Sequence, residues 1–419
     1  MRQDRRLYQI YAIIFIDVVV GTALGPILPQ FVRGVNRPQL WLALGTALFL
    51  GVQLVSAPLL GKLADGYGRR PIFILSSVGT LLANCLMLPI TLGAQLANRL
   101  TDGFTNGMYA TVRSAITDIS PKEQLFKNLG IEGAIVSFGF VIGPAVSGAL
   151  LTVFDVAAGE QARVIVWMAI VLSVLNVGLS WALGETHPNP PGRDGAPIDT
   201  TALRSELVQS INVTTLWSRL LAKNQVRPGL KQLVLMQVAL TLGTGYYNYF
   251  VTYVSFGSLH LSAKGISFLF MYFGSLSVAA NYIFYTYFAD RINQRRAIVW
   301  LAGLGVPVLA GYGLVGTSLI SFYVLVTIDC LTLSFIQGLI EGLMAQRTTD
   351  DDRGEVFGIN QAMQGLASFV TTVVFGALSL IDLRVPFGWF AACLALVGWL
   401  AYRTATAPVI QPQIEKTDA

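Results

Sequence analysis

The sequence predicts an all-α polytopic membrane protein, and two features carry this prediction. Charged residues make up 12% of the 419 residues and hydrophobic residues 54%, whereas a soluble protein carries about 25% charged residues. Apolar runs recur along the whole chain, each of about 20 residues, the length that crosses a hydrocarbon core of about 30 Å. Because lipid offers the backbone no hydrogen-bond partners, each run is expected to be a helix.

We expect about twelve transmembrane helices. The first follows a basic N-terminus, as in a signal peptide, but it contains Asp17 and lacks a small-x-small cleavage site. We therefore interpret it as an uncleaved first span. In chain order the expected spans lie near 8–32, 40–60, 72–93, 95–117, 129–153, 164–183, 230–254, 264–288, 297–316, 319–344, 357–380 and 386–404.

The basic residues predict the orientation. Most lysines and arginines fall in the two termini and in every second loop, while the other loops hold only Arg33, Arg37, Arg163, Lys264 and Arg384. Because basic loops stay on the cytoplasmic side, both termini are expected in the cytoplasm and the chain in the cell (inner) membrane. The net charge of +5 lies in short loops rather than on one face, so no nucleic-acid partner is expected.

The longest polar segment divides the chain into halves. "GETHPNPPGRDGAP" at 184–197 is rich in helix breakers, and after it Leu203, Leu207 and Ile211 form one stripe of a possible surface helix. We therefore expect an N-terminal six-helix bundle (1–183), a cytoplasmic linker (184–229), and a C-terminal six-helix bundle with a short tail (230–419).

The two halves resemble each other weakly. "ADGYGRR" (64–70) matches "ADRINQRR" (289–296), and "LGIEG" (129–133) matches "FGINQ" (357–361) at nearly the same offset. Either these short motifs coincide by chance or a six-span unit is duplicated. Duplicated units with a substrate site at their interface are a transporter architecture.

Signatures of other functions are missing from the sequence. Cys85, Cys330 and Cys393 fall inside apolar runs, and His187 and His260 fall in loops. Their spacing suits neither metal ligands nor a disulfide framework, and the chain contains no P-loop lysine pattern or nucleophile elbow. We therefore expect no enzyme activity, no metal and no cofactor.

Four motifs carry a family resemblance. "GKLADGYGRRP" (61–71) joins spans two and three, and "DVVVGTALGPILP" in span one starts at Asp17. "RLTDG" in span four places Arg99 and Gly103 in an R-x-x-x-G pattern, and "GFVIGPAVSG" in span five has the pattern G-x-x-x-G-P-x-x-x-G. With these motifs the chain resembles the major facilitator superfamily over nearly its full length. Its first half is most similar to the twelve-span drug:proton antiporters, which include tetracycline exporters.

The resemblance implies a major-facilitator fold of two pseudo-symmetric six-helix bundles that work by alternating access. It also implies that Asp65 docks at the start of span eleven and forms, with Arg69 and Asp118, a charge relay that latches the outward-open state. Arg113 and Glu132 depart from the antiporters, which usually carry a small and a neutral residue there. The residues that the resemblance assigns to the conformational switch are Gly61, Asp65, Gly68, Arg69, Arg70, Asp118, Gly139, Gly143 and Pro144.

Ionisable residues inside the spans are candidate coupling sites, because each costs about 2.5–3.5 kcal/mol on insertion scales and is usually functional or paired. Arg99 and Asp102 are three residues apart and share a helix face, either as a proton-coupling pair or as a permanent ion pair. Asp17 has no charged neighbour at helical spacing. This isolation favours proton carriage or substrate contact over a plain hydrogen-bonding role.

Four further charged residues are embedded in the spans. Arg113 and Glu132 are expected on neighbouring elements in the cytoplasmic third, where they form either an inner gate or a plain salt bridge. Asp329 and Glu341 in span ten are the acids of the second half. Each is an additional titrating site in one interpretation. In the other, Glu341 is simply solvated near the helix end.

Span seven adds a polar aromatic stretch, which either lines a cavity or packs against helices and lipid: Tyr246, Tyr247, Asn248 and Tyr253. Aromatic faces beside acids favour lipophilic or cationic ligands. The main hypothesis is a monomeric proton-driven exporter of such small molecules. The alternative is a proton-coupled symporter or facilitator for a sugar, organic anion or lipid, and a third is a sensor or enzyme on this scaffold.

Overall fold

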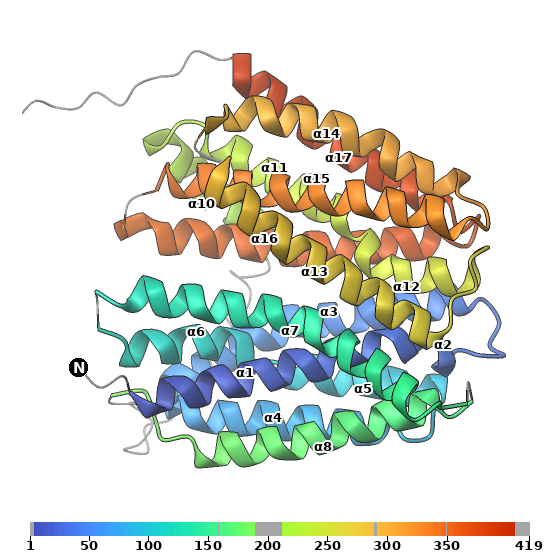
Figure 1. Cartoon of the computed structure of the whole chain (residues 1–419). Coiled ribbons are helices and arrows are strands. Elements are labelled where there is room, and N and C mark those ends of the chain that lie inside the picture. Colours follow the sequence, from blue (N-terminus) through green and yellow to red (C-terminus); the bar gives the residue numbers. More distant parts are fainter. Residues whose placement is uncertain are drawn as a thin grey trace, which may run out of the picture.

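The computed structural model describes residues 4–121, 123–157, 159–188, 212–288, 291–348 and 350–406. All regular elements in these ranges are helices. They form two bundles that follow each other in sequence and lie one above the other in Figure 1, the first coloured blue to green and the second yellow to red. This arrangement confirms the predicted all-α membrane fold.

The first bundle holds eight α-helices and one 3₁₀ turn. The first span is α1 (Arg5–Leu24), which continues through η1 (Gly25–Ile27) and α2 (Leu28–Phe31). The others are α3 (Pro38–Tyr67), α4 (Arg69–Leu86), α5 (Leu92–Thr105), α6 (Met108–Ile119), α7 (Leu125–Val153) and α8 (Gln161–Ala182).

The second bundle repeats this layout after the linker. Its elements are α10 (Val213–Val226), α11 (Leu230–Thr244), α12 (Tyr246–Phe256), α13 (Ala263–Tyr287), α14 (Gln294–Gly311), η4 (Tyr312–Leu314), α15 (Leu319–Ala345), α16 (Asp350–Leu378) and α17 (Val385–Thr406). In the described part of the chain, nine helical segments are long and apolar enough to cross a membrane. The three other expected spans are α4 and the pairs α5–α6 and α11–α12.

Two expected spans are broken where the sequence suggested continuous helices. The span expected at 95–117 ends its first helix before Asn106, whose ψ of 67° leaves the helical region, and resumes at Met108. A Cβ on Gly107 would lie 2.5 Å from the Cβ of Leu60, so the chain passes α3 too closely there for any larger residue. The span expected at 230–254 is divided at Gly245, whose φ of −53° and ψ of −20° stay in the helical region.

The linker helix belongs with the second bundle. Lys223 of α10 forms a 2.6 Å ion pair with Glu355 of α16, and Leu216 and Leu220 are buried. The stripe expected at Leu203, Leu207 and Ile211 lies outside the described residues, as does Asp290 of the second-half loop.

The two bundles have different cores. Among the described residues the first contains two larger apolar clusters, one around Ile10 and Phe73 and the other around Leu24 and Ile165, and a small third one around Leu60 and Ile72. The second contains one large cluster rich in aromatic residues. Polar side chains occupy the middle of the first bundle: the described hydrogen bonds there include Asn84 Nδ2 to Ser173 Oγ at 2.9 Å. The first bundle therefore places a polar layer at mid-membrane depth between two apolar ends.

The bundles meet at the end remote from the linker, as the right-hand side of Figure 1 shows. Here α3 packs on α16, and a Cβ on Gly376 would lie 2.7 Å from the Cβ of Ala43. On the other side α7 packs on α13, where a Cβ on Gly148 would lie 3.2 Å from the Cβ of Ser267. Toward the linker the described contacts thin out: a Cβ on Gly61 or Gly358 would have no neighbour within 4 Å. The described close contacts between the bundles therefore lie toward the far end.

Candidate functional site

The polar layer of the first bundle brings the mid-membrane charges together. Asp17 of α1 and Asp102 of α5 act electrostatically on each other, and Arg99 acts on Asp102. Thr80 of α4 donates a 3.2 Å hydrogen bond from its hydroxyl to Oδ1 of Asp102. Two helices, α1 and α5, thus supply two carboxylates and one guanidinium to one site, and α4 adds a hydroxyl. The spacing of Arg99 and Asp102 alone predicted this site only in part.

Small residues let α3 and α5 approach closely enough to position Arg99. A Cβ on Gly45 would lie 2.9 Å from Nε2 of Gln95 and 3.7 Å from Cγ of Arg99. A Cβ on Gly103 would lie 2.8 Å from the backbone oxygen of Phe49, whose ring lies 5.9 Å from the Arg99 guanidinium carbon. The R-x-x-x-G pattern therefore joins a charge to the glycine that brings its helix against α3.

A second charged layer lies closer to the linker end. Nε of Arg113 on α6 is 3.4 Å from Oε2 of Glu132 on α7. Arg113 also acts electrostatically on Glu341 of α15 in the opposite bundle, and Glu341 accepts a 3.3 Å hydrogen bond from Nε2 of Gln337. The expected pairing of Arg113 with Glu132 is present, and the charge of Arg113 also acts on a carboxylate of the opposite bundle.

Sequence reasoning missed two tyrosines near these charges. Tyr109 experiences the charges of Asp17, Asp102 and Glu132, so it links the two charged layers. Tyr11 on α1 is also within the field of Glu132, and its hydroxyl donates a 2.9 Å hydrogen bond to the backbone oxygen of Asn128. Both lie in apolar stretches, and the sequence pattern there does not show whether a tyrosine hydroxyl faces the charged residues or the ring only packs against other helices.

The loop between α3 and α4 forms the ion pairs that the resemblance implied. Arg69 pairs with Asp65 through Nη1 and with Asp118 through Nε at 2.9 Å. Gly68 has φ of +102°, a conformation that favours glycine. The side chains at the start of α16, Asp350–Arg353, lie outside the described part, so docking of Asp65 there stays a prediction.

The glycines of α7 form a close contact with α1. A Cβ on Gly143 would lie 2.7 Å from the backbone oxygen of Val19, and one on Gly139 would lie 2.7 Å from Cγ1 of Val18. Pro144 lies inside α7, and the hydroxyl of Ser147 donates a 2.8 Å hydrogen bond to the backbone oxygen of Ala23. The motif of span five therefore holds α1, with Asp17, tightly against α7.

The aromatic stretch of span seven divides between surface and core. Asn248 is exposed and Tyr247 half-buried, with the Tyr247 ring 4.5 Å from that of Phe273. Tyr253 lies in the core: it is 2% exposed, and its hydroxyl donates a 2.6 Å hydrogen bond to the backbone oxygen of Tyr312. It packs among aromatic rings because its helix face points to the second core. The side chain of Tyr246 lies outside the described residues.

Asp329 also lies in the second core rather than near the charged layers. It is 1% exposed, and Oδ2 accepts a 2.8 Å hydrogen bond from the hydroxyl of Tyr312. Within the described ranges, no group of three or more His, Cys, Asp and Glu side chains is arranged to hold a metal ion.

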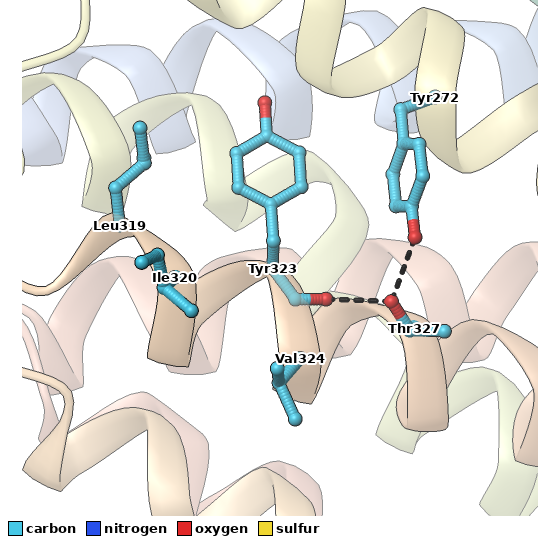
Figure 2. Close-up of a pocket in the computed structure, with 6 residues that line it drawn as sticks. All are labelled: Tyr272, Leu319, Ile320, Tyr323, Val324 and Thr327. Atoms are coloured by element: carbon cyan, nitrogen blue, oxygen red, sulfur yellow. Dashed lines mark hydrogen bonds between the residues drawn. The ribbon is translucent and has the colours of Figure 1, made fainter.

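Two surface hollows lie on the second bundle, away from the charged layers. One, of about 360 Å³, lies between α13 and α15 (Figure 2), where the hydroxyls of Tyr272 and Thr327 are 2.7 Å apart. The other, of about 360 Å³, lies near the far end and includes Tyr253, His260 and Asp382. Both hollows are lined only by residues of the second bundle. A substrate site shared between the two halves would instead be lined by both.

Comparison with known proteins gives concordant results. The model of the Major Facilitator Superfamily matches residues 10–370. A quinolone resistance protein, NorA of Staphylococcus aureus (strain MSSA476), is 23% identical over 94% of this chain and 95% of its own. The class H tetracycline resistance protein of Pasteurella multocida is 32% identical over 34% of this chain. That match spans 37% of the tetracycline resistance protein's own length.

The fold is shared with solved structures. A bacterial homologue of the iron transporter ferroportin, solved in an inward-facing state, superposes with a TM-score of 0.71 at 12% identity, covering 96% of this chain and 99% of that one. At this identity the likeness concerns the fold alone.

Proposed function

The chain belongs to the Major Facilitator Superfamily, and from this premise we propose that it exports small lipophilic or cationic compounds in exchange for protons. As a transporter of this family it is a multi-pass membrane protein. In the proposal the linker end is cytoplasmic, both termini are cytoplasmic, the membrane is the cell (inner) membrane, and the protein is a monomer without catalytic activity.

The observation that carries the proposal is the shared site of Asp17, Asp102 and Arg99. Two carboxylates within each other's field are balanced by one guanidinium, so the ionised site has one uncompensated negative charge. A proton or a cationic substrate removes this charge, and an uncompensated charge at this depth is costly. Mutually exclusive binding of the two cations at one site produces exchange.

The looser packing of the two bundles toward the linker end supports the direction of transport. With that end cytoplasmic, as the basic loops predict, the described conformation presents the site to the compartment from which a drug is exported. Closure of α3 and α7 against the second bundle at the far end seals the other side. Rocking of the bundles reverses these two conditions, as in transporters with a central site between repeats.

The relatives also favour export, since their names record resistance to quinolones and tetracyclines. The match to NorA covers 94% of the chain. For this chain the substrate class remains the proposal, because identity to the full-length relative is low.

An organic anion taken up with protons is the second candidate, and Arg113 favours it. Its side chain is 60% exposed although it lies within a span, and arginine binds carboxylates and phosphates bidentately. Glu132 and Glu341 beside it argue for a cation instead, because together they outnumber the arginine.

The test uses inverted membrane vesicles with an acidic lumen and ethidium as a lipophilic cation. Addition of ethidium to wild-type vesicles is expected to release protons from the lumen, and Asp17→Asn is expected to abolish this release. Asp155→Asn, which changes an exposed aspartate beyond α7, is the matched control. Proton release that persists in the Asp17 variant contradicts the assignment, and proton uptake on adding an organic anion supports the second candidate.

A further inference from the structure

The carboxylate of Glu185 lies at the start of the linker and contacts the first turn of α4. Its Oε1 accepts a 2.8 Å hydrogen bond from the backbone N–H of Arg69, and Oε2 accepts one of 3.2 Å from that of Arg70. The N–H groups of Thr186 and His187 also donate to Oε1, both at 2.9 Å. One side chain therefore receives four backbone donors from two segments far apart in sequence.

The contact is reciprocal between two helix ends. The first N–H groups of a helix and its last carbonyls have no partners within the helix. Glu185, three residues beyond α8, caps the start of α4, while Nη2 of Arg70 donates a 2.8 Å hydrogen bond to the backbone oxygen of Trp181 in the last turn of α8. A carboxylate at a helix N-terminus is also favoured by the helix dipole.

Gly68 leaves room for this carboxylate. A Cβ on Gly68 would lie 2.4 Å from Oε2 of Glu185, so a larger residue would displace this carboxylate. The φ of +102° independently favours glycine. Beside it, Arg69 is 8% exposed and pairs with Asp65 and Asp118 through its guanidinium. The backbone of Arg69 is thus held by Glu185 and its side chain by the two aspartates.

We propose that Glu185 is the positioning residue of the switch loop, defined as residues 65–70. By fixing the first turn of α4, it directs the Arg69 guanidinium between Asp65 and Asp118. Because Glu185 begins the segment that leads to the second bundle, the same contact joins the linker to the loop. Nη1 of Arg6 adds the N-terminal helix, donating a 2.6 Å hydrogen bond to the backbone oxygen of Glu185.

Glutamine is the informative substitution. Glu185→Gln keeps the size of the side chain but replaces one acceptor by an NH₂ group that faces backbone donors. If Glu185 acts through Arg69, its loss changes the balance between the two states of the transporter. A purely structural cap instead lowers the melting temperature and leaves that balance unchanged.

Spin labels measure the balance without knowledge of the substrate, so this test is separate from that of the proposed function, although it rests on alternating access. Labels at Lys127 of α7 and Arg291 beyond α13, both exposed, report the distance between bundles at the linker end. Exposed Cys85 is replaced by serine, while buried Cys330 and Cys393 remain. The short-distance population represents the state closed at the linker end.

Glu185→Gln is expected to lower the ratio of the short-distance to the long-distance population about tenfold, the scale of a lost charged cap. In an Arg69→Ala background it should have no additional effect, because both changes act on one element. Glu160→Gln, at the opposite end of α8 in an exposed ion pair with Arg163, should leave the ratio unchanged. A wild-type ratio in Glu185→Gln, or full additivity with Arg69→Ala, overturns the proposal.

Discussion

Nε of Arg113 lies 3.4 Å from Oε2 of Glu132, and the two partners have opposite surroundings: Arg113 is 60% exposed, whereas Glu132 is 3% exposed. The buried carboxylate depends on the arginine for its charge balance, whereas the guanidinium is already largely exposed to solvent. The pair is therefore asymmetric: the buried carboxylate needs its partner, whereas the exposed guanidinium does not.

This asymmetry predicts that removing Arg113 destabilises the protein more than removing the arginine of an exposed ion pair does. Arg113→Met leaves a buried carboxylate without its counter-charge and is expected to destabilise the protein by about 1–3 kcal/mol. Adding Glu132→Gln should recover most of the loss, since no buried charge remains. Thermal unfolding in detergent measures both. Arg163→Met removes an exposed pair and should cost at most about 1 kcal/mol; an equal loss in both arginine variants contradicts the prediction.

Gly143→Ala is expected to damage the contact between α1 and α7. The new methyl group meets the backbone oxygen of Val19 at 2.7 Å, and such overpacking costs about 1–3 kcal/mol. Because α1 carries Asp17, proton exchange should fall with stability. Gly178→Ala is the control: it lies in α8 with no neighbour within 4 Å and should stabilise by up to about 1 kcal/mol. A Gly143 variant with unchanged melting temperature would oppose this interpretation of the motif.

Gly376→Val should shift the conformational balance rather than unfold the protein. Its side chain separates α16 from α3 at Ala43, a contact that exists only while the far end is closed. We expect the state open at the linker end to become less populated, as measured by the spin labels at Lys127 and Arg291. Gly358→Val is the control, because a Cβ at this position of the same helix has no neighbour within 4 Å, and it should not depopulate that state. A larger shift in the Gly358 variant than in the Gly376 variant would refute the assignment of the interface.

Tyr312→Phe tests whether Asp329 has a structural role or takes part in proton coupling. The substitution removes the 2.8 Å hydrogen bond to Asp329 in the second core and should destabilise by about 1–3 kcal/mol, with proton exchange per transported substrate unchanged. Tyr272→Phe, whose hydroxyl is in an exposed groove with Thr327 (Figure 2), should cost less. Altered stoichiometry in the Tyr312 variant would instead make Asp329 part of the coupling machinery.

Features set by residues close together in sequence could be predicted, whereas features set by contacts between distant parts of the chain could not. Apolar length located the nine described helical segments that are long and apolar enough to cross a membrane, because a helix in lipid is set by its own composition. The pairing of Arg113 with Glu132 was accessible because adjacent elements carry two costly charges. The break at Asn106 was missed, since it depends on how closely Gly107 passes Leu60.

Other features required the tertiary structure. Glu185 lies 116 residues from Arg69 in a stretch that looked like linker, and no local pattern marks it as a cap for another helix. Tyr253 and Asp329 share spans with residues that face the other bundle, and uniformly apolar helices do not reveal which face a polar residue occupies. These are the positions at which orientation, rather than composition, decides the role.

The tight contact of α1 with α7 has a consequence for biogenesis. Val19 emerges early in synthesis, yet the glycine that accommodates it is Gly143, and chains are made at about 5–20 residues per second. During this interval the helix that carries Asp17 waits in the membrane without its closest partner. The first bundle therefore matures only when α7 arrives, and a chaperone or insertase that shields α1 would act within this window of translation.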